Sequence, residues 1–294
     1  MISISRMEWW WALVTVLLIL TVVLVFKSRS YFQGEIPKII WSYWDDPNVP
    51  PLTQKCMDNW KRMCPEYEIK LLNKSDVPDE YKDLTPERQS DWLRLERLKT
   101  HGGIWLDASV ILTESLDWVQ GSGEALMFYQ KAMAKDKDAR MYESWFIASI
   151  PNGKFITALF NEFDFACRTF KNDGDKYIEH LKKNYGSEKV EDILQNIFRG
   201  LIGYLTIYIC IQKVIKIDKV DGNLIKGIPG EEGPILYQTK HRWNHENVVK
   251  DLIGPWPAEG VNKLVKLVRE DRKHLQKHDW MHPHPNSIFA KFLI

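Results

Sequence analysis

The sequence has almost no net charge. Its 294 residues include 40 lysines and arginines against 39 aspartates and glutamates, a formal charge of +1 at pH 7. Proteins that bind nucleic acid usually carry a clustered excess of basic residues that neutralises phosphates. The balance therefore argues against a nucleic-acid partner and favours small-molecule chemistry.

Cysteine is also scarce. There are four cysteines, and none has the Cys-x-x-Cys or cysteine–histidine spacing that is typical of zinc sites. We therefore expect isolated or buried thiols. A disulfide between Cys56 and Cys64 is the open alternative, if the protein lies in an oxidising compartment.

Residues 9–26 form a long apolar run without charge. Eighteen residues are about the minimum that crosses a bilayer, and the three tryptophans at the start of the run resemble an interfacial anchor. We predict a membrane anchor there, a short tail at 1–8, a short stem at 27–36 and one folded domain at 37–294. A cleaved signal peptide is the alternative, but the run is long for one and no small-x-small cleavage site follows it.

A helix-to-strand passage in the middle of the chain carries the most chemical information. Pro86 follows a capping threonine and Gly102 stands where a helix would end, which predicts a helix over residues 87–101. Asp91 and Arg94 are three residues apart on this helix, so they share a face. An acid and a base placed in this way can address one ligand together.

The residues after this helix supply a second acid. Two short β-prone runs, Ile104–Leu106 and Val110–Leu112, flank Asp107 and Ser109. In an extended segment these two side chains lie on the same side, and their oxygens suit a hard divalent cation, which in turn suits a diphosphate. A helix, a glycine stop and a strand also occur in many α/β proteins that bind nothing at this point. The residues alone leave both interpretations open.

The remaining pattern predicts an α/β domain. A strand, a helix and a strand in succession indicate a βαβ unit and a mostly parallel sheet. The segments are strands at 38–43, 68–72, 125–129 and 145–150, helices at 52–63 and 152–170, a buried helix at 201–211, a loop at 227–234 and a charged helix at 261–275.

Three aromatic residues end the first predicted strand. Ligands gather at the carboxyl ends of parallel strands, so Trp41, Tyr43 and Trp44 are placed where an aromatic ring could stack on a nucleobase. Core packing is the alternative for each. Near the other end of the chain, residues 280–287 hold two histidines that are each followed by a proline, which predicts a shaped loop.

The central motif, SDxxRxxxLxxxGGIWLDAS, resembles the DxD-type sugar-nucleotide region of retaining glycosyltransferases. The similarity is to the capsular polysaccharide synthesis group and its relatives among α-mannosyltransferase-like enzymes and clostridial glucosylating toxins. Segments 36–44, 65–73 and 144–148 resemble further strands of that family, so the resemblance covers about residues 36–150. It implies a GT-A domain, which is Rossmann-like, with a mostly parallel sheet flanked by helices.

The resemblance also implies a site. It predicts a divalent cation, Mn²⁺ or Mg²⁺, on the donor diphosphate, and a C-terminal loop that returns to the donor. The implied residues are Asp107, Ser109 and His282 for the metal, Asp91 and Arg94 for the donor sugar, Trp41 and Tyr43 for the base, and Asp91, Arg94 and Asp107 for catalysis, with Ser109 also on the donor.

The function implied is transfer of a sugar, with retention, from a nucleotide-diphosphate sugar to a glycan or glycolipid. Many anchored relatives have a cytoplasmic tail and a luminal catalytic domain, so a type II protein of the Golgi or endoplasmic reticulum is expected if the source is eukaryotic. A rival from another class is an inactive, membrane-anchored glycan-binding scaffold, because Ser109 stands where strict DxD has its second aspartate. A nucleotide-sugar hydrolase is a third possibility.

Overall fold

The computed structural model describes residues 34–133, 140–195, 197, 202–255 and 263–294. Residues 36–294 form one compact unit. The predicted anchor at residues 9–26 lies outside the described residues. Among the helices that are described, none is long and apolar enough to cross a membrane.

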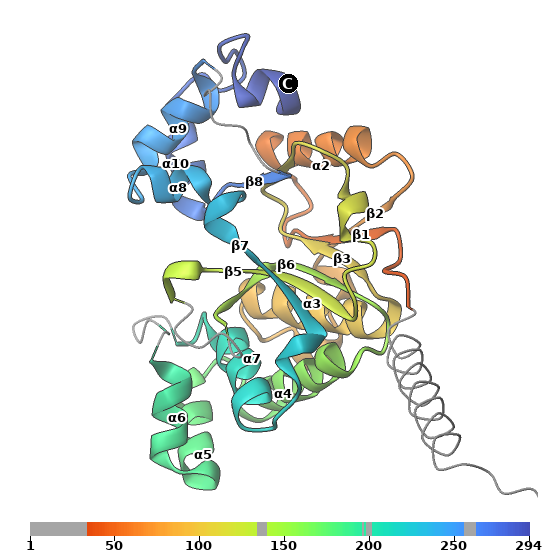
Figure 1. Ribbon diagram of the computed structural model, residues 1–294, viewed down its shortest axis with the longest axis vertical. Coiled ribbons are helices and arrows are strands. Elements are labelled where there is room, and N and C mark those ends of the chain that lie inside the picture. Colours follow the sequence, from red (N-terminus) through yellow and green to blue (C-terminus); the bar gives the residue numbers. More distant parts are fainter. Residues whose placement is uncertain (1–33, 134–139, 196, 198–201, 256–262) are drawn as a thin grey trace, which may run out of the picture. The chain divides into compact units, whose positions relative to one another are not determined.

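The centre of this unit is a six-stranded sheet (Figure 1). Only β6 runs antiparallel to its neighbours, so the sheet is mostly parallel, as the sequence predicts. The strands, in spatial order, are β2 (Glu68–Leu72), β1 (Ile39–Tyr43), β3 (Gly103–Leu106), β6 (Tyr142–Ser149), β5 (Ala125–Tyr129) and β7 (Ile225–Pro229).

Helices cover both faces of this sheet, which completes an α/β architecture (Figure 1). On one face lie α3 (Pro86–His101), α4 (Lys154–Phe170) and α7 (Thr206–Lys216), and on the other α2 (Pro51–Met63) and α9 (His245–Ile253). The other described α-helices are α5 (Gly174–Tyr185), α6 (Ser187–Leu194), α8 (Leu236–Lys240) and α10 (Arg269–Leu275).

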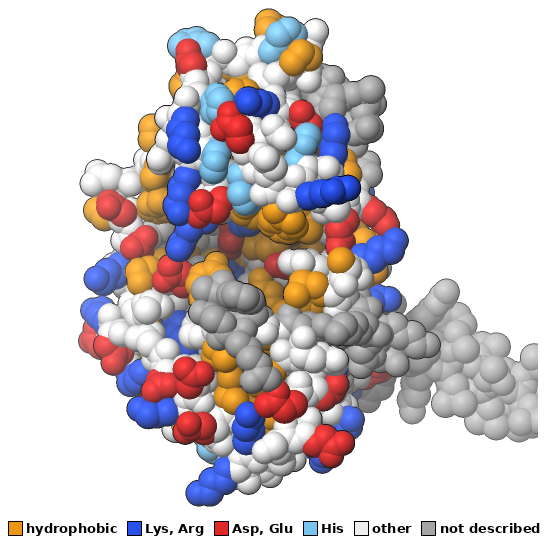
Figure 2. All heavy atoms as spheres, turned by 90° about the vertical axis from the view of Figure 1, so that its left-hand side faces the viewer, with side chains coloured by type: hydrophobic (Ala, Val, Ile, Leu, Met, Phe, Trp, Pro, Cys, Tyr) orange, Lys and Arg blue, Asp and Glu red, His pale blue; other side chains and the backbone are white. Residues whose placement is uncertain are grey.

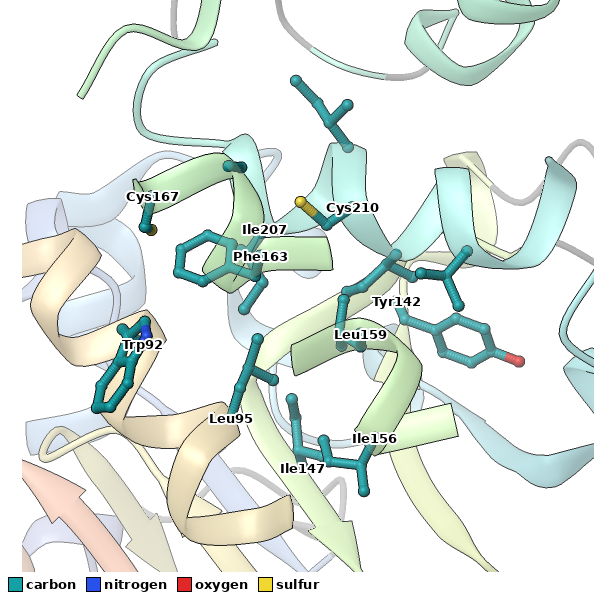
Figure 3. Close-up of a cluster of buried hydrophobic side chains, with 14 of the residues drawn as sticks. Trp92, Leu95, Tyr142, Ile147, Ile156, Leu159, Phe163, Cys167, Ile207 and Cys210 are labelled. Carbon is teal, nitrogen blue, oxygen red and sulfur yellow. The ribbon is translucent and has the colours of Figure 1, made fainter. Parts of the chain in front are cut away.

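Side chains alternate between the two faces of each strand, and this separates two hydrophobic cores. In β3, Trp105 belongs to the core beneath α3 and α4, whereas Ile104 and Leu106 belong to the core beneath α2. Figure 3 shows the first core, where Trp92, Leu95, Phe163 and other apolar side chains from the helices meet Ile147 of the sheet. Burial on both faces fixes the register of β3, and with it the position of the residues that follow.

The boundaries of α3 follow from its sequence. Thr85 caps the helix, with its Oγ1 accepting from the backbone N–H of Arg88 at 3.4 Å, and Pro86 occupies the first turn. Gly102 ends it at φ +67°, where a Cβ would lie 2.7 Å from Cδ of Pro151. The predicted helix is thus confirmed to within one residue.

A two-stranded sheet and the edge strand β7 of the main sheet each correct one prediction. β4 (Val110–Leu112) pairs antiparallel with β8 (Leu264–Lys266), so the helix predicted at 261–275 is partly a strand and only α10 is helical. The charges around residues 264–266 give a helical pattern, but the fully buried Leu264 and Val265 pack in the core instead. The loop predicted at 227–234 begins as β7, an edge strand, where Pro229 is tolerated.

The four cysteines are buried free thiols. The alternative of a disulfide between Cys56 and Cys64 is therefore not realised in this structure.

Candidate active site

A cavity of about 350 Å³ lies where β1 and β3 end and β6 begins. Helices α3 and α7 and the segment from β8 to α10 supply the rest of its wall. This is the carboxyl edge of the parallel strands, where ligands of such sheets gather. Its charged lining residues are Asp45, Glu87, Asp91, Arg94, Asp107, Glu143, Lys266, Arg269 and Arg272.

The structure brings Asp91, Arg94 and Asp107 together in this cavity. Arg94 donates to Asp91, and its Nη2 lies 3.1 Å from Oδ1 of Asp107. The guanidinium also lies 4.8 Å from the ring centroid of Trp105, within cation–π distance. Burial raises the pKa of Asp91 to about 6, although Arg94 opposes the shift. The pKa of Asp91 thus lies well above that of Asp107, which is about 2.

Asp107 is the most heavily paired group of the site. Its Oδ2 lies 2.7 Å from Nζ of Lys266, and its Oδ1 also accepts from the indole of Trp105 at 3.2 Å. Burial alone would raise the pKa of Asp107, but the charges of Lys266 and Arg94 outweigh it and lower the pKa to about 2. Asp107 is thus an anion at every pH at which the protein would work.

Ser109 lines the same cavity as Asp107, although residues 108–109 form a turn and not the extended segment that was predicted. It joins the central motif to the C-terminal segment. Its Oγ donates to the carbonyl oxygen of Leu267 at 3.0 Å and accepts from Nη1 of Arg272 at 2.8 Å. The backbone N–H of Leu267 in turn donates to the Ser109 carbonyl oxygen at 3.0 Å. These bonds extend the β4–β8 pairing into the cavity wall.

The sequence did not reveal Lys266 and Arg272 as site residues. Both come from the segment that was predicted to be a charged amphipathic helix, and only the pairing of β8 with β4 brings them to Asp107 and Ser109. Other polar lining residues were missed too, among them Glu143 at the start of β6 and Tyr208 in α7, whose Oη donates to Glu143 at 2.9 Å. Burial raises the pKa of Glu143, opposed by hydrogen bonds from Gln130 and Tyr208.

The aromatic residues of β1 divide between the cavity and the core. Tyr43 lines the cavity and donates to Oε1 of Gln89 at 3.1 Å. Trp44 lines it as well, and among the described residues its buried Nε1 has no hydrogen-bond partner. Trp41 does not line the cavity: its Nε1 donates to the Gly102 carbonyl oxygen at 2.9 Å. Trp41, two residues before Tyr43 in the strand, is a core residue, so the structure does not place it where it could stack on a base.

The prediction for His282 is wrong in its placement. Its side chain is 83% exposed, pairs with Asp279 at 3.0 Å and does not line the cavity. Figure 2 shows histidines gathered at the surface of the upper, C-terminal part of the molecule. The C-terminal segment does return to the site, but through β8 and the start of α10, and no residue of 280–287 lines the cavity.

The lining residues do not fit a resident divalent cation. Among the described residues, no group of three or more His, Cys, Asp or Glu side chains could hold a metal ion. Both oxygens of Asp107 already accept from cationic side chains, and Ser109 holds Arg272. A divalent ion on these oxygens would lie beside Lys266 and Arg94, whose charges repel it.

The chain is thus an α/β protein with a charged cavity at the carboxyl ends of its parallel strands. Residues 23–164 match the family model for capsular polysaccharide synthesis proteins, which confirms the resemblance found in the sequence and supports glycosyltransferase activity. The matched part includes Asp91, Arg94, Asp107, Ser109 and Glu143 but not β8. No curated protein matches the chain significantly.

Solved structures of glycosyltransferases are similar at low identity. The PaToxG glycosyltransferase is 14% identical over 65% of this chain and 94% of its own, with a TM-score of 0.36. A glycosyltransferase involved in glycosylation of the major capsid of PBCV-1 is 10% identical over 81% and 97%, with a TM-score of 0.39. GlyE of Streptococcus pneumoniae is 11% identical over 80% and 55%, with a TM-score of 0.42. Likenesses this weak do not bear on the chemistry of the site.

Proposed function

We propose that the chain is a glycosyltransferase that moves a sugar from a nucleotide-diphosphate sugar to a hydroxyl of a glycan or glycolipid. The observation that carries the proposal is the cavity, in which cationic and anionic side chains alternate within one wall. Sugar transfer separates charge, because the leaving diphosphate becomes more negative while the sugar becomes oxocarbenium-like. A site with both signs in contact suits both halves of that transition state.

The residues divide between these tasks. Arg94, Lys266 and Arg272 face the leaving diphosphate, and the carboxylates of Asp91 and Glu143 face the developing positive charge on the sugar. Tyr43 and Trp44 hold the base, and the unpartnered N–H of Trp44 is a donor for its edge. The family resemblance favours retention of the anomeric configuration.

The rival scaffold function loses its main support. It depended on the missing second aspartate at Ser109, but that serine binds Arg272, so the departure from strict DxD does not leave the site incomplete. We therefore favour an enzyme. We further propose that residues 9–26 anchor it in a membrane as a type II protein with a luminal catalytic domain.

A donor screen tests the proposal. The full chain in detergent is given UDP-, GDP-, CDP- and dTDP-sugars, and the released nucleoside diphosphate is measured with and without glycan acceptors. We expect release that depends on the acceptor, with an axial or equatorial product linkage, read by NMR, that matches the donor. Equal release without acceptor would indicate a hydrolase, and no release from any donor by folded protein would contradict the proposal.

A further inference from the structure

The segment from Lys266 to Arg272 forms an anion site of its own within the cavity. The Lys266 side chain is only 7% exposed, and its Nζ lies 2.7 Å from Asp107 and 3.4 Å from Oγ of Ser109. Arg272 reaches the same Ser109 oxygen at 2.8 Å. The side chains of Lys266 and Arg272 thus both contact the neutral hydroxyl of Ser109. An aspartate at this position, as in strict DxD, would have balanced their charge.

Lys266 and Arg272 are only partly balanced by carboxylates. Lys266 shares its partner Asp107 with Arg94, which also pairs with Asp91. Within the described part of the chain, Arg272 has no carboxylate partner, and its contact is the Ser109 hydroxyl. Cations at a cavity wall are normally paired, so a guanidinium there that contacts a neutral hydroxyl indicates an anionic ligand.

The surrounding structure holds Arg272 in place. Asp271, which is fully buried, accepts from Nε2 of Gln238 at 2.7 Å and from the Val268 N–H at 3.0 Å, and pairs with Nδ1 of His245 at 2.7 Å. This anchors the start of α10 against α8 and α9. The guanidinium on the next residue is therefore preorganised, and little entropy is lost when it binds a ligand.

We propose that Lys266, Arg272 and Ser109 bind the diphosphate of the donor directly. The ammonium group of Lys266 then occupies the position beside Asp107 that a divalent cation would otherwise take. Donor binding then needs no divalent metal. This inference rests on the proposed function only for the identity of the donor, because an anion site can be measured without sugar transfer.

Calorimetry of the full chain in detergent tests the inference with inorganic pyrophosphate and with UDP, GDP, CDP and ADP. We expect pyrophosphate and one of the nucleotides to bind equally well in excess chelator and with added Mn²⁺. Lys266→Gln and Arg272→Gln should each weaken pyrophosphate at least about tenfold, the loss of one charge-assisted hydrogen bond. Affinity that rises tenfold or more with Mn²⁺ in the wild type would overturn the inference.

Two neighbouring lysines provide controls. Lys263 pairs with Glu114 and Lys273 with Glu270 at the surface, and neither lines the cavity. Their glutamine variants should bind pyrophosphate as the wild type does. Because Lys266→Gln removes a buried charge and can impair folding, Lys266→Arg serves as a second variant. It should fold and keep binding in chelator, and dependence of that variant on Mn²⁺ would count against the inference.

The Lys266→Gln variant also gives a positive test. With Lys266 neutralised, Asp107 is released to a metal, so Mn²⁺ should restore part of the pyrophosphate affinity in this variant but not in the wild type. No recovery in a folded variant would show that Lys266 does not stand in the place of an ion. Binding in chelator without sugar transfer would contradict only the proposed function, whereas transfer and pyrophosphate binding that both require Mn²⁺ would contradict only this inference.

Discussion

Lys266 and Asp107 are 159 residues apart in the chain, yet Nζ of Lys266 lies 2.7 Å from Oδ2 of Asp107. Their contact exists because β8 pairs with β4, which begins three residues after Asp107, in the register that sets Val110 opposite Lys266. The pair joins the two parts of the chain that form the cavity. Removing either charge leaves the other buried with less compensation.

Asp107→Asn should lower sugar-transfer activity by about a hundredfold or more while the protein stays folded. The amide keeps an oxygen but loses the charge that orients Lys266 and Arg94 toward the diphosphate. Activity against the preferred donor measures the loss, and Asp192→Asn is the matched control, because the Asp192 side chain is 55% exposed and pairs with Lys216 outside the cavity. Near-normal turnover in folded Asp107→Asn would contradict the assignment.

The low pKa of Asp107 predicts that the difference in stability between the wild type and Asp107→Asn depends on pH. The pKa of Asp107 is about 2 in the folded protein, below the ordinary value of 3.8, so its contribution is present above pH 4 and is lost as the pH falls toward 2. We expect the wild type to exceed Asp107→Asn by about 2 kcal/mol in unfolding free energy at pH 7. Urea unfolding at pH 7 and pH 2.5 measures it. A difference that stays the same at both pH values would be inconsistent with the ion pair.

Asp91→Asn should change stability in the opposite direction. Burial raises the pKa of Asp91 to about 6, so its contribution to stability is greatest below about pH 4 and is lost as the pH rises through 6. A neutral asparagine avoids that loss, and the variant should be more stable than the wild type at pH 7.5 by about 2 kcal/mol. The advantage should shrink as the pH falls from 6 to 4.

Activity should still fall in Asp91→Asn, because the carboxylate is lost from the sugar side of the cavity. Thermal unfolding at pH 7.5 and pH 4 measures the change in stability, and donor turnover measures the change in activity. A variant that is less stable than the wild type at pH 7.5 would mean that the pair with Arg94 outweighs burial.

Local signals account for the part of the site that sequence predicted. The capped helix, the two glycines and the short strand fix Asp91, Arg94, Asp107 and Ser109 through contacts close in the chain. These elements appear within one or two residues of their predicted bounds. The βαβ order also follows from local pattern, because β1 and β2 need a crossover helix to run parallel.

Non-local pairing decided the rest. Lys266 lies in a three-residue strand whose charge pattern is helical, and only β4 supplies its hydrogen-bond partners. Likewise Trp41 and Trp44 are both aromatic and three residues apart, and nothing in the sequence tells which one α3 covers. His282 received a metal role because the family resemblance implies a C-terminal loop at the donor, but in the structure it is exposed and pairs with Asp279 at the surface.

Gly103→Ala should destabilise the protein strongly. Gly103 has φ +101°, and a Cβ there would lie 2.7 Å from the Ile39 carbonyl oxygen and 3.1 Å from Nε1 of Trp41. We expect a loss of about 3 kcal/mol, from the backbone conformation and the clash together. Gly121→Ala is the control, because Gly121 has φ +70° but open space around it, so strain alone should cost about 1 kcal/mol. Equal losses in urea unfolding would show that β1 can move away from β3.

Residues 9–26 should make the full chain an integral membrane protein. Eighteen uncharged residues that begin with three tryptophans can span the hydrocarbon core, and the charges at 27 and 29 hold the end of the run at the interface. After carbonate extraction we expect the full chain in the membrane pellet, a fragment of residues 31–294 in the supernatant, and protease protection of the catalytic domain in sealed vesicles. Release of the full chain at high pH, or a mature amino terminus near residue 30, would identify the segment as a cleaved signal peptide instead.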